Sequence, residues 1–444
     1  MPDVSKRVSW AETVLASLGP LPGAGEIRAA CWAALAVTVL LVALSIAAAA
    51  HGRSFLGHAP CADFVQFYAA GKILNEYPPA RLYDGPLDDR LQHALVPQMK
   101  PEVALVFANA PFVAALFRPL ARLPLLASYA IWMAVSALLY AAGLALVWPR
   151  GREFDVVSRT ALLACLSFAP FVIECCAGGQ VSAIGFFALA LATRWRARLP
   201  FAAGAALAVC LYKPTLVVLV APLLVAGRRF RMLAGFAVSA AALGALSLAT
   251  VGRDGCLAYL RTLRLYAEMT ARNPSPLPLF KYVDIHTFFR LLAGGHAPWI
   301  AVAASIMALA AFAVLAVRWA RSRPATRADD LLWAATIAWT LVANLYVPIY
   351  DATIVVIPML LMAGAVYGGR CAASRPAFLG WALVLYVSAW VSQPLAFYAR
   401  FQAFTLVLAG IGALALRLSR QEDLEAQQSA AGERDDGALR QAER

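Results

Sequence analysis

The chain has 444 residues, of which 62% are hydrophobic and only 14% are charged, and its formal net charge is +13. This composition excludes an ordinary soluble domain, in which about a quarter of the residues are charged. The positive charge lies mostly in short arginine-rich connectors, which favours cytoplasmic loops over nucleic-acid binding. The apolar runs do not alternate as β-barrel strands do, so they predict an all-α polytopic membrane protein.

The N-terminal part of the chain predicts one membrane helix followed by a long polar loop. Residues 1–27 are polar and are expected to form a cytoplasmic segment. The first apolar run, about 28–50, is too long for the core of a signal peptide and predicts a retained helix. The loop 51–103 is expected outside the cytoplasm. A helical period over 64–74 and a second helix near 86–96 suit the membrane interface.

The remaining apolar runs predict about 12 crossings within a single transmembrane domain, 28–418. Run 104–121 carries Asn109, Pro111 and Arg118, which suit a re-entrant or interfacial hairpin. If it spans as well, the count is 13. The runs after the first lie at about 104–121, 124–148, 160–178, 180–194, 199–212, 214–227, 231–250, 296–317, 331–347, 352–368, 376–391 and 402–417.

Arginine-rich connectors alternate along the chain with other connectors, which predicts that each set lies on its own side of the membrane. The tail, 419–444, is charged, lacks an apolar period and predicts a disordered cytoplasmic segment. The arginine-rich connectors lie within 150–159, 194–198, 228–231, 318–327, 370–375 and 417–420. The connectors expected on the outer side are 51–103, 178–180, 213–214, 251–295, 346–351 and 392–400, of which 51–103 and 251–295 are long.

Two residues stand out as candidates for chemistry. Asp63 lies at the head of the predicted helix in the first outer loop, where it can act as a general base or cap the helix N-terminus. Lys213 interrupts an apolar run. It suits either a lysine whose ammonium reaches the membrane surface or a cation that binds a phosphate.

Further polar residues fall on the same predicted side. Gln180 can bond a sugar hydroxyl, but on its own it favours a turn cap. Asp351, which follows Tyr350, can cap the next helix or pair with an outer lysine or arginine. His286 and Arg290 are four residues apart and share a helix face, where either can meet a phosphate or lipid headgroups.

Other chemistries find no support in the sequence. Nucleotide-binding and serine-hydrolase motifs are absent, and five scattered histidines argue against a zinc site. Tyr83 and Asp84 predict a turn. A disulfide between Cys61 and Cys256, both in outer loops, stays open.

These residues resemble, in order and spacing, a bacterial family now grouped as glycosyltransferase family 87. The resemblance covers roughly residues 60–370. Its pieces are Asp63-Phe64 with Tyr68-Ala69-Ala70-Gly71, Leu82-Tyr83-Asp84, Ala110-Pro111-Phe112, Arg118-Pro119-Leu120, Leu123-Pro124, Trp132, Gly179-Gln180, Tyr212-Lys213-Pro214, Arg228-Arg229, residues 288–292 and Tyr350-Asp351.

The resemblance implies a GT-C-like fold and a membrane glycosyltransferase, since family members include α-mannosyltransferases that use polyprenyl-phosphate-mannose. It implies Asp63 as the general base of an inverting transfer and Lys213 as a phosphate ligand. Tyr68, Tyr83, Gln180 and the late polar residues become candidate substrate contacts. Many mannosyltransferase members have a Trp-Asp-His-like element late in the chain, whereas this chain has Ile349-Tyr350-Asp351-Ala352 without the histidine. That departure leaves the sugar and the acceptor open.

The resulting hypothesis is a multi-pass enzyme of the bacterial inner membrane with an extracytoplasmic active site. It moves a hexose or pentose from a polyprenyl phosphate to a hydroxyl of a glycan or glycolipid, with no cofactor and no metal required. Two alternatives stand beside it. A transporter or flippase of a lipid-linked sugar would need polar groups near the membrane midplane, whereas these polar groups cluster near one face. The large outer loops would suit a polymerase or ligase of lipid-linked glycans, but such enzymes usually expose more arginines there.

Overall fold

The computed structural model describes residues 23–51, 61, 63–99, 105–271 and 278–442, so most of the predicted segment 1–27 lies outside the described residues. Within these ranges the regular secondary structure is helical, apart from one isolated bridge between Tyr282 and Pro348. The prediction of an all-α protein is therefore confirmed. The α-helices are α2 (Ala24–Ala50), α3 (Phe64–Glu76), α4 (Gly85–Leu95), α5 (Pro111–Phe117), α6 (Leu125–Val147), α7 (Arg152–Leu166), α8 (Ser182–Trp195), α9 (Pro200–Ala208), α10 (Val220–Ala226), α11 (Phe230–Ala271), α12 (Ile285–Leu292), α13 (Pro298–Arg321), α14 (Arg327–Val342), α15 (Val356–Gly368), α16 (Arg375–Ala399) and α17 (Ala403–Ala442).

Seven helices among the described residues are long and apolar enough to cross a membrane. An eighth span results if α7 and the bent helical turn that follows it count as one. The structure thus supports a multi-pass membrane protein, but the predicted count of about 12 is not confirmed. Several apolar runs of the sequence fold into helices shorter than the roughly 20 residues of a perpendicular span, among them α8, α9 and α10.

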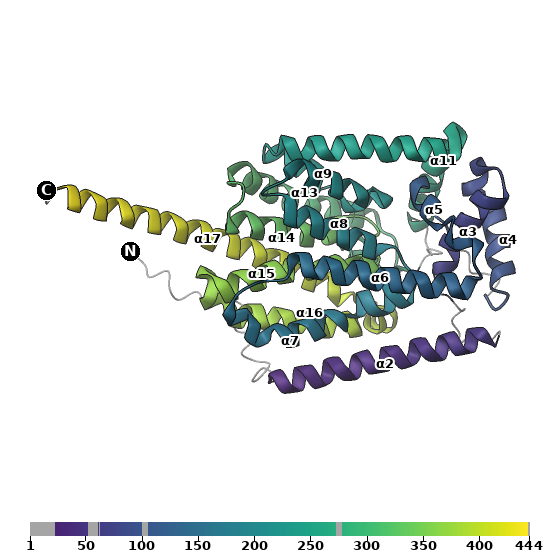
Figure 1. Ribbon diagram of the computed structural model, residues 1–444, viewed down its shortest axis with the longest axis horizontal. Helices are drawn as coiled ribbons and strands as arrows, with labels where there is room; N and C mark the ends of the chain where they lie inside the picture. The colour runs from purple at the N-terminus through teal and green to yellow at the C-terminus, as the bar shows by residue number, and fades with distance from the viewer. Residues whose placement is uncertain (1–22, 52–60, 62, 100–104, 272–277, 443–444) are drawn as a thin grey trace.

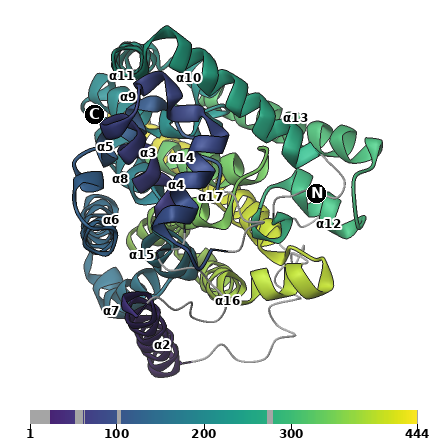
Figure 2. The same cartoon turned by 90° about the vertical axis from the view of Figure 1, so that its right-hand side faces the viewer.

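Helices α2, α6, α11 and α17 run roughly parallel to the longest axis of the molecule (Figure 1). In that view α11 lies along one edge of the bundle and α2 along the opposite edge, while α3, α4 and α5 gather at one end. Figure 2 looks onto that end, with α3 and α4 toward the viewer. Helix α3 is buried on most sides, not on one face as its sequence period predicted, because it packs against α4 and α5.

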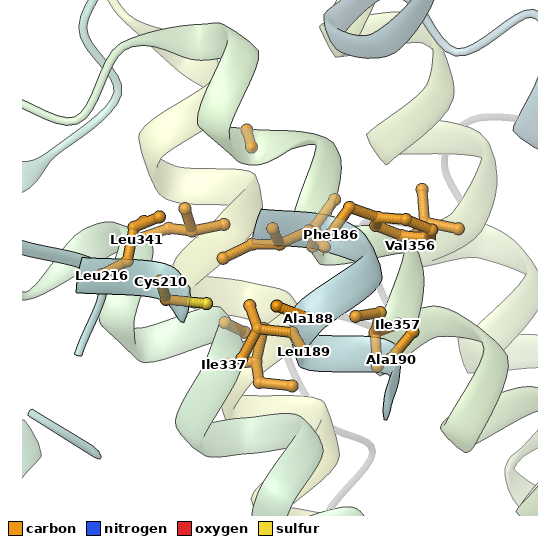
Figure 3. Close-up of a cluster of buried hydrophobic side chains, with 14 of the residues drawn as sticks. Phe186, Ala188, Leu189, Ala190, Cys210, Leu216, Ile337, Leu341, Val356 and Ile357 are labelled. Carbon is orange, nitrogen blue, oxygen red and sulfur yellow. The ribbon is translucent and has the colours of Figure 1, made fainter. Parts of the chain in front are cut away.

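The core is centred on α8, which is built from small and apolar residues and is buried along most of its length. Figure 3 shows Phe186 and Leu189 of α8 among Ile337 of α14 and Ile357 of α15. All four belong to one continuous cluster of buried apolar side chains. This packed centre separates the two ends of the bundle, where the polar residues gather.

Two helices differ from their predicted ends. Helix α11 joins the predicted run 231–250 to the helical part of the outer loop, through a kink at Gly252, whose φ is 69°. Helix α17 continues to Ala442, through the tail that the sequence predicted to be disordered. That tail is rich in Ala, Glu, Gln and Arg, which are strong helix formers.

The arginine-rich connectors meet at one end of the bundle, as the alternating pattern predicted. Ion pairs and hydrogen bonds between different connectors bring them together. Arg196 pairs with Asp329 and Asp330, Arg229 with Asp329 (2.7 Å), Arg318 with Asp423 (2.7 Å) and Arg375 with Glu153 (2.5 Å), while Arg327 donates to the carbonyl of Gly368 (2.7 Å).

The other set of connectors meets at the opposite end. The amide of Asp63 donates to the carbonyl of Gly178 (3.0 Å), and the amide of Val283 donates to that of Val347 (2.8 Å). The loop 51–103 therefore contacts the middle of the chain, and the segment around Val283 contacts its last third. We call the two ends the arginine end and the Asp63 end.

A cavity of 320 Å³ lies between α2, α7, α15 and α16 and is lined mainly by apolar side chains such as Val157, Met359 and Leu383. None of the residues singled out in the sequence as candidates for chemistry lines it. The candidate site therefore has to be built from the side chains at the Asp63 end.

Candidate functional site

Asp63 is held against the loop 178–180 by a backbone contact that requires glycine. Besides the bond from the Asp63 amide to Gly178, Gly179 adopts φ +76°, in the left-handed region that favours glycine. A Cβ atom at Gly179 would lie 2.5 Å from Cβ and 3.1 Å from Cα of Phe64. The absence of a side chain at position 179 thus lets the start of α3 approach the loop closely.

The Asp63 side chain does not cap α3, although it occupies the N-cap position. Its backbone is helical (φ −78°, ψ −8°), and the carboxylate makes no capping bond. One carboxylate oxygen, Oδ2, instead accepts a 2.6 Å hydrogen bond from Nε2 of Gln180. The cap that the sequence left open for Asp63 is therefore not formed, and its role as a general base stays a prediction.

Gln180 is itself fixed in place. Its side chain is almost fully buried, and its backbone N–H donates to the carbonyl of Cys175 (2.9 Å). The indole of Trp132 donates to the Gln180 carbonyl (3.3 Å). A buried donor held in this way orients the Asp63 carboxylate while Asp63 itself stays partly exposed.

Lys213 forms an ion pair with Asp351, which is 1% exposed. The other oxygen of Asp351 accepts from the hydroxyl of Ser182 (2.6 Å). The Lys213 ammonium also lies 4.7 Å from the ring centre of Tyr350. Of the two roles left open for Asp351, pairing with a lysine or arginine is the one observed. Asp351 lies inside the 3-10 helix η8 (Ile349–Val355), not at a helix cap.

The Asp63 contact and the Lys213 contact are neighbours. Gln180 holds Asp63 and Ser182, two residues further along, holds Asp351, the partner of Lys213. The helical turns that carry these groups also pack together, since η4 (Pro170–Ala177) contacts η8. The structure thus places the loop-one carboxylate and the lysine from the middle of the chain in one polar cluster at the Asp63 end.

A second ion pair lies next to this cluster and was not foreseen from the sequence. The Lys281 ammonium lies 3.4 Å from Glu174, and the other oxygen of Glu174 accepts from Gln393 (2.7 Å). Glu174 belongs to η4, a π-helix that follows the break at Pro170. Such π-helical turns occur frequently at functional sites.

Both Asp63 and Glu174 affect the pKa of Lys281. Burial lowers the pKa of the Lys281 ammonium, but Glu174 and Asp63 outweigh that effect and leave the pKa above its ordinary value. Lys281 is therefore charged at neutral pH and lies within electrostatic reach of Asp63.

The residues around Lys281 are fixed by buried polar contacts. Gln402 is fully buried and its side-chain amide donates to the carbonyls of Phe280 (2.9 Å) and Tyr282 (3.2 Å), one on each side of Lys281. The Tyr282 hydroxyl lies 2.6 Å from that of Tyr266. Contacts from α11 and from the residue that precedes α17 thus hold the short segment that carries Lys281.

His286 and Arg290 lie on α12 and are both buried. The His286 ring contacts Tyr346, with ring centres 5.6 Å apart. Burial, with Arg290 and His296, lowers the pKa of His286 to about 4, so the imidazole is neutral at pH 7 and adds no positive charge for a phosphate. Asp284 caps this helix by accepting from the amide of Thr287 (2.9 Å).

Tyr68 and Tyr83 contribute to packing of the first long loop, 51–103. The Tyr68 hydroxyl donates to the carbonyl of Leu123 (2.8 Å), and the Tyr83 hydroxyl donates to that of Asn109 (2.7 Å). Asp84 caps α4 by accepting from the amide of Leu87 (3.1 Å). Neither tyrosine makes a described contact with the Asp63–Gln180 or Lys213–Asp351 pairs.

No group of three or more potential metal ligands is found in the part of the chain that the structure describes. Cys61 and Cys256 are both free, so the disulfide left open by the sequence does not form. Burial raises the pKa of the Cys61 thiol to about 12, which leaves it protonated at neutral pH.

Glu174, Lys281, Gln393 and Gln402 are the members of the cluster that the sequence reasoning missed. One signal was available for Glu174, which is the only acidic residue in the apolar run 160–178. An ionisable residue within such a run is by default a candidate for function. Lys281 offered no comparable signal, because it lies in a long polar loop.

Comparison with known proteins gives one match. The profile of glycosyltransferase family 87 matches residues 107–344, slightly more than half of the chain. No curated protein and no solved structure matches the chain significantly. The matched range includes Gln180, Lys213 and Lys281, whereas Asp63 precedes it and Asp351 follows it.

Proposed function

The chain belongs to glycosyltransferase family 87, and we propose on that basis that it transfers a sugar from a polyprenyl-phosphate donor to an acceptor hydroxyl at the outer face of a bacterial inner membrane. Membership indicates a membrane glycosyltransferase. The donor, the side of the membrane and the residue roles are the proposal. The observation that supports it best is the partly exposed carboxylate of Asp63, held by the buried amide of Gln180.

The position of the arginine end supports the outer location. Positively charged loops stay in the cytoplasm, so the arginine end faces inward and the Asp63 end faces outward. A polyprenyl-phosphate sugar presents its phosphate and anomeric carbon at the membrane surface, while its lipid chain stays in the bilayer. The Asp63 end is therefore where such a donor meets the protein.

The proposed reaction is a single displacement at the anomeric carbon. Asp63 takes the proton of the acceptor hydroxyl as its oxygen forms a bond to that carbon. The bond from the carbon to the phosphate oxygen breaks, and the electron pair leaves with the polyprenyl phosphate. One displacement inverts the configuration. A cation beside the leaving phosphate stabilises the charge that develops on it.

The sugar is a mannose-like hexose or a pentose, and the acceptor is a glycan or glycolipid. The alternative of a transporter of lipid-linked sugars is less well supported, because the ion pairs described here gather at the two ends of the bundle while α8 at its centre is packed with small and apolar side chains.

Asp63→Asn tests the proposal. The amide keeps the size of the side chain but takes no proton, so we expect transfer to fall by about 10²- to 10⁴-fold. The assay follows radiolabelled sugar from a series of polyprenyl-phosphate sugars into acceptor lipids, with the purified protein in liposomes. Asp84→Asn serves as the control, because Asp84 lies in the same loop but caps α4. Unchanged transfer by Asp63→Asn would remove Asp63 from the mechanism.

A further inference from the structure

We propose that Lys281 binds the phosphate of the donor, and that Lys213 is a positioning residue that holds Asp351 and Tyr350. The sequence pointed to Lys213 for the phosphate. The inference rests on the proposed function, since it names the cation that the proposed reaction requires. It follows from a comparison of the two lysines that flank Asp63.

Lys213 is already committed to partners within the protein. Its ammonium pairs with Asp351 and lies against the ring of Tyr350. Asp351 is 1% exposed, and only the Ser182 hydroxyl would remain on it if the lysine moved to a ligand. A buried carboxylate that loses its cation is strongly destabilised. Moving the Lys213 ammonium away from Asp351 therefore costs free energy.

Lys281 is more easily released. Its side chain is 35% exposed, and its distance to Glu174 is 3.4 Å, longer than a normal charge-assisted hydrogen bond. Glu174 is 14% exposed and keeps the 2.7 Å bond from Gln393 if Lys281 turns away. The carboxylate thus retains a donor and some access to water when the lysine binds an anion.

The backbone around Lys281 is held in place by hydrogen bonds. Gln402 binds the carbonyls before and after it, and the Val283 amide donates to Val347, close to the Tyr350–Asp351 turn. A flexible side chain on a fixed backbone can exchange one anion for another without moving the loop. Preorganisation of this kind lowers the cost of binding.

Lys281 also lies near Asp63, the proposed general base. Glu174 lies on the π-helix η4 that leads into Gly178, whose carbonyl accepts from the Asp63 amide. Lys281 and Asp63 therefore contact residues that are only four positions apart, Glu174 and Gly178. A phosphate bound by Lys281 places the anomeric carbon next to Asp63, so the acceptor hydroxyl can approach between them.

In the reaction, Lys281 gives no proton and forms no covalent bond. Its ammonium moves from Glu174 to the phosphate oxygen that carries the sugar. When the bond between that oxygen and the anomeric carbon breaks, the oxygen keeps the electron pair and the ammonium stabilises the added negative charge. Return of Lys281 to Glu174 accompanies release of the polyprenyl phosphate.

The test measures lipid binding, so it needs no knowledge of the sugar. Binding of undecaprenyl phosphate and of uncharged undecaprenol to the full-length protein is compared for the wild type, Lys281→Ala, Lys281→Arg and Lys72→Ala. Lys72 is a control lysine on α3, paired with Glu76 of the same helix. We expect Lys281→Ala to weaken binding of the phosphate about 10- to 100-fold and to leave undecaprenol binding unchanged.

Lys281→Arg should keep most of the preference for the phosphate, and Lys72→Ala all of it. Equal losses of both lipids in Lys281→Ala would indicate a structural role and overturn the inference, as would a preserved preference. A wild-type protein that does not prefer the phosphate over the alcohol would instead contradict the proposed donor. The two failures are therefore distinguishable.

Discussion

Asp329 at the arginine end and Asp63 at the opposite end are both carboxylates that accept tertiary hydrogen bonds, but the donors of those bonds differ in kind. Asp329 is 2% exposed and accepts from Arg196 and Arg229. Asp63 is partly exposed and accepts from the neutral amide of Gln180. The first carboxylate binds two guanidinium groups, while the second keeps access to solvent.

This difference separates a structural role from a chemical one. Two guanidinium groups on a buried carboxylate tie α14 to the connectors before α9 and α11, and their removal would leave buried charge. An amide donor fixes the direction of a carboxylate without neutralising it. Asp63 therefore remains able to take a proton from a ligand, as a general base must.

Asp329→Ala gives the largest effect that we expect at the arginine end. It leaves Arg196 and Arg229 without their shared partner, so the free energy of unfolding should fall by about 3–5 kcal/mol. The thermal midpoint in lipid nanodiscs measures this change. Transfer per folded molecule, assayed well below the midpoint, should stay near the wild-type value.

Asp423→Ala is the matched control for that variant. Asp423 also pairs with an arginine, Arg318, but its side chain is 42% exposed. An exposed pair contributes about 1 kcal/mol or less. If Asp423→Ala proves as destabilising as Asp329→Ala, burial does not distinguish these pairs. If Asp329→Ala abolishes transfer while the fold is intact, the two ends are not functionally separate.

The sequence predicted much of this arrangement. The alternation of arginine-rich connectors with other connectors placed Arg196, Arg229 and Arg318 at one end, and the contacts confirm that they meet there. The membrane favours apolar residues in each span and positive charges in the cytoplasmic loops, so its effect is visible along the whole sequence. The family was predicted from short motifs that resemble those of the family in their order and spacing.

The partners within the site could not be predicted in the same way. That Lys213 pairs with Asp351, 138 residues away, depends on how η8 packs against α8. Gln402 binds the Lys281 segment only because α17 starts beside it. The count of about 12 spans is not confirmed for a related reason, since short apolar helices such as α8 are buried by neighbours and need not reach across the bilayer.

Gly179→Ala tests whether the loop 178–180 must approach α3 closely. The added Cβ would clash with Phe64, and the alanine would have to adopt a positive φ. We therefore expect the substitution to displace Asp63 from Gln180. Transfer should fall by about 10- to 100-fold, with a smaller change in thermal midpoint. Gly294→Ala is the control, because φ there is +71° but the near atom is the flexible end of Arg400. Equal effects of the two variants would mean that backbone strain, not the approach of α3, decides the result.

Gln180→Glu changes the nature of the donor while keeping its size, and it should shift the pH dependence of transfer. The wild-type amide donates to the Asp63 carboxylate and favours its charged form, whereas a glutamate places a second negative charge beside it. The proton is then held more tightly, and the base form appears only at higher pH. We expect the acidic limb of the pH–rate profile to move up by about one pH unit, with transfer partly recovered above that limb. Gln180→Ala removes the donor without adding charge and should move the limb less. A profile unchanged in Gln180→Glu would mean that the Asp63 carboxylate does not titrate in the step that the assay measures, and the contrast between a structural and a chemical carboxylate would then fail.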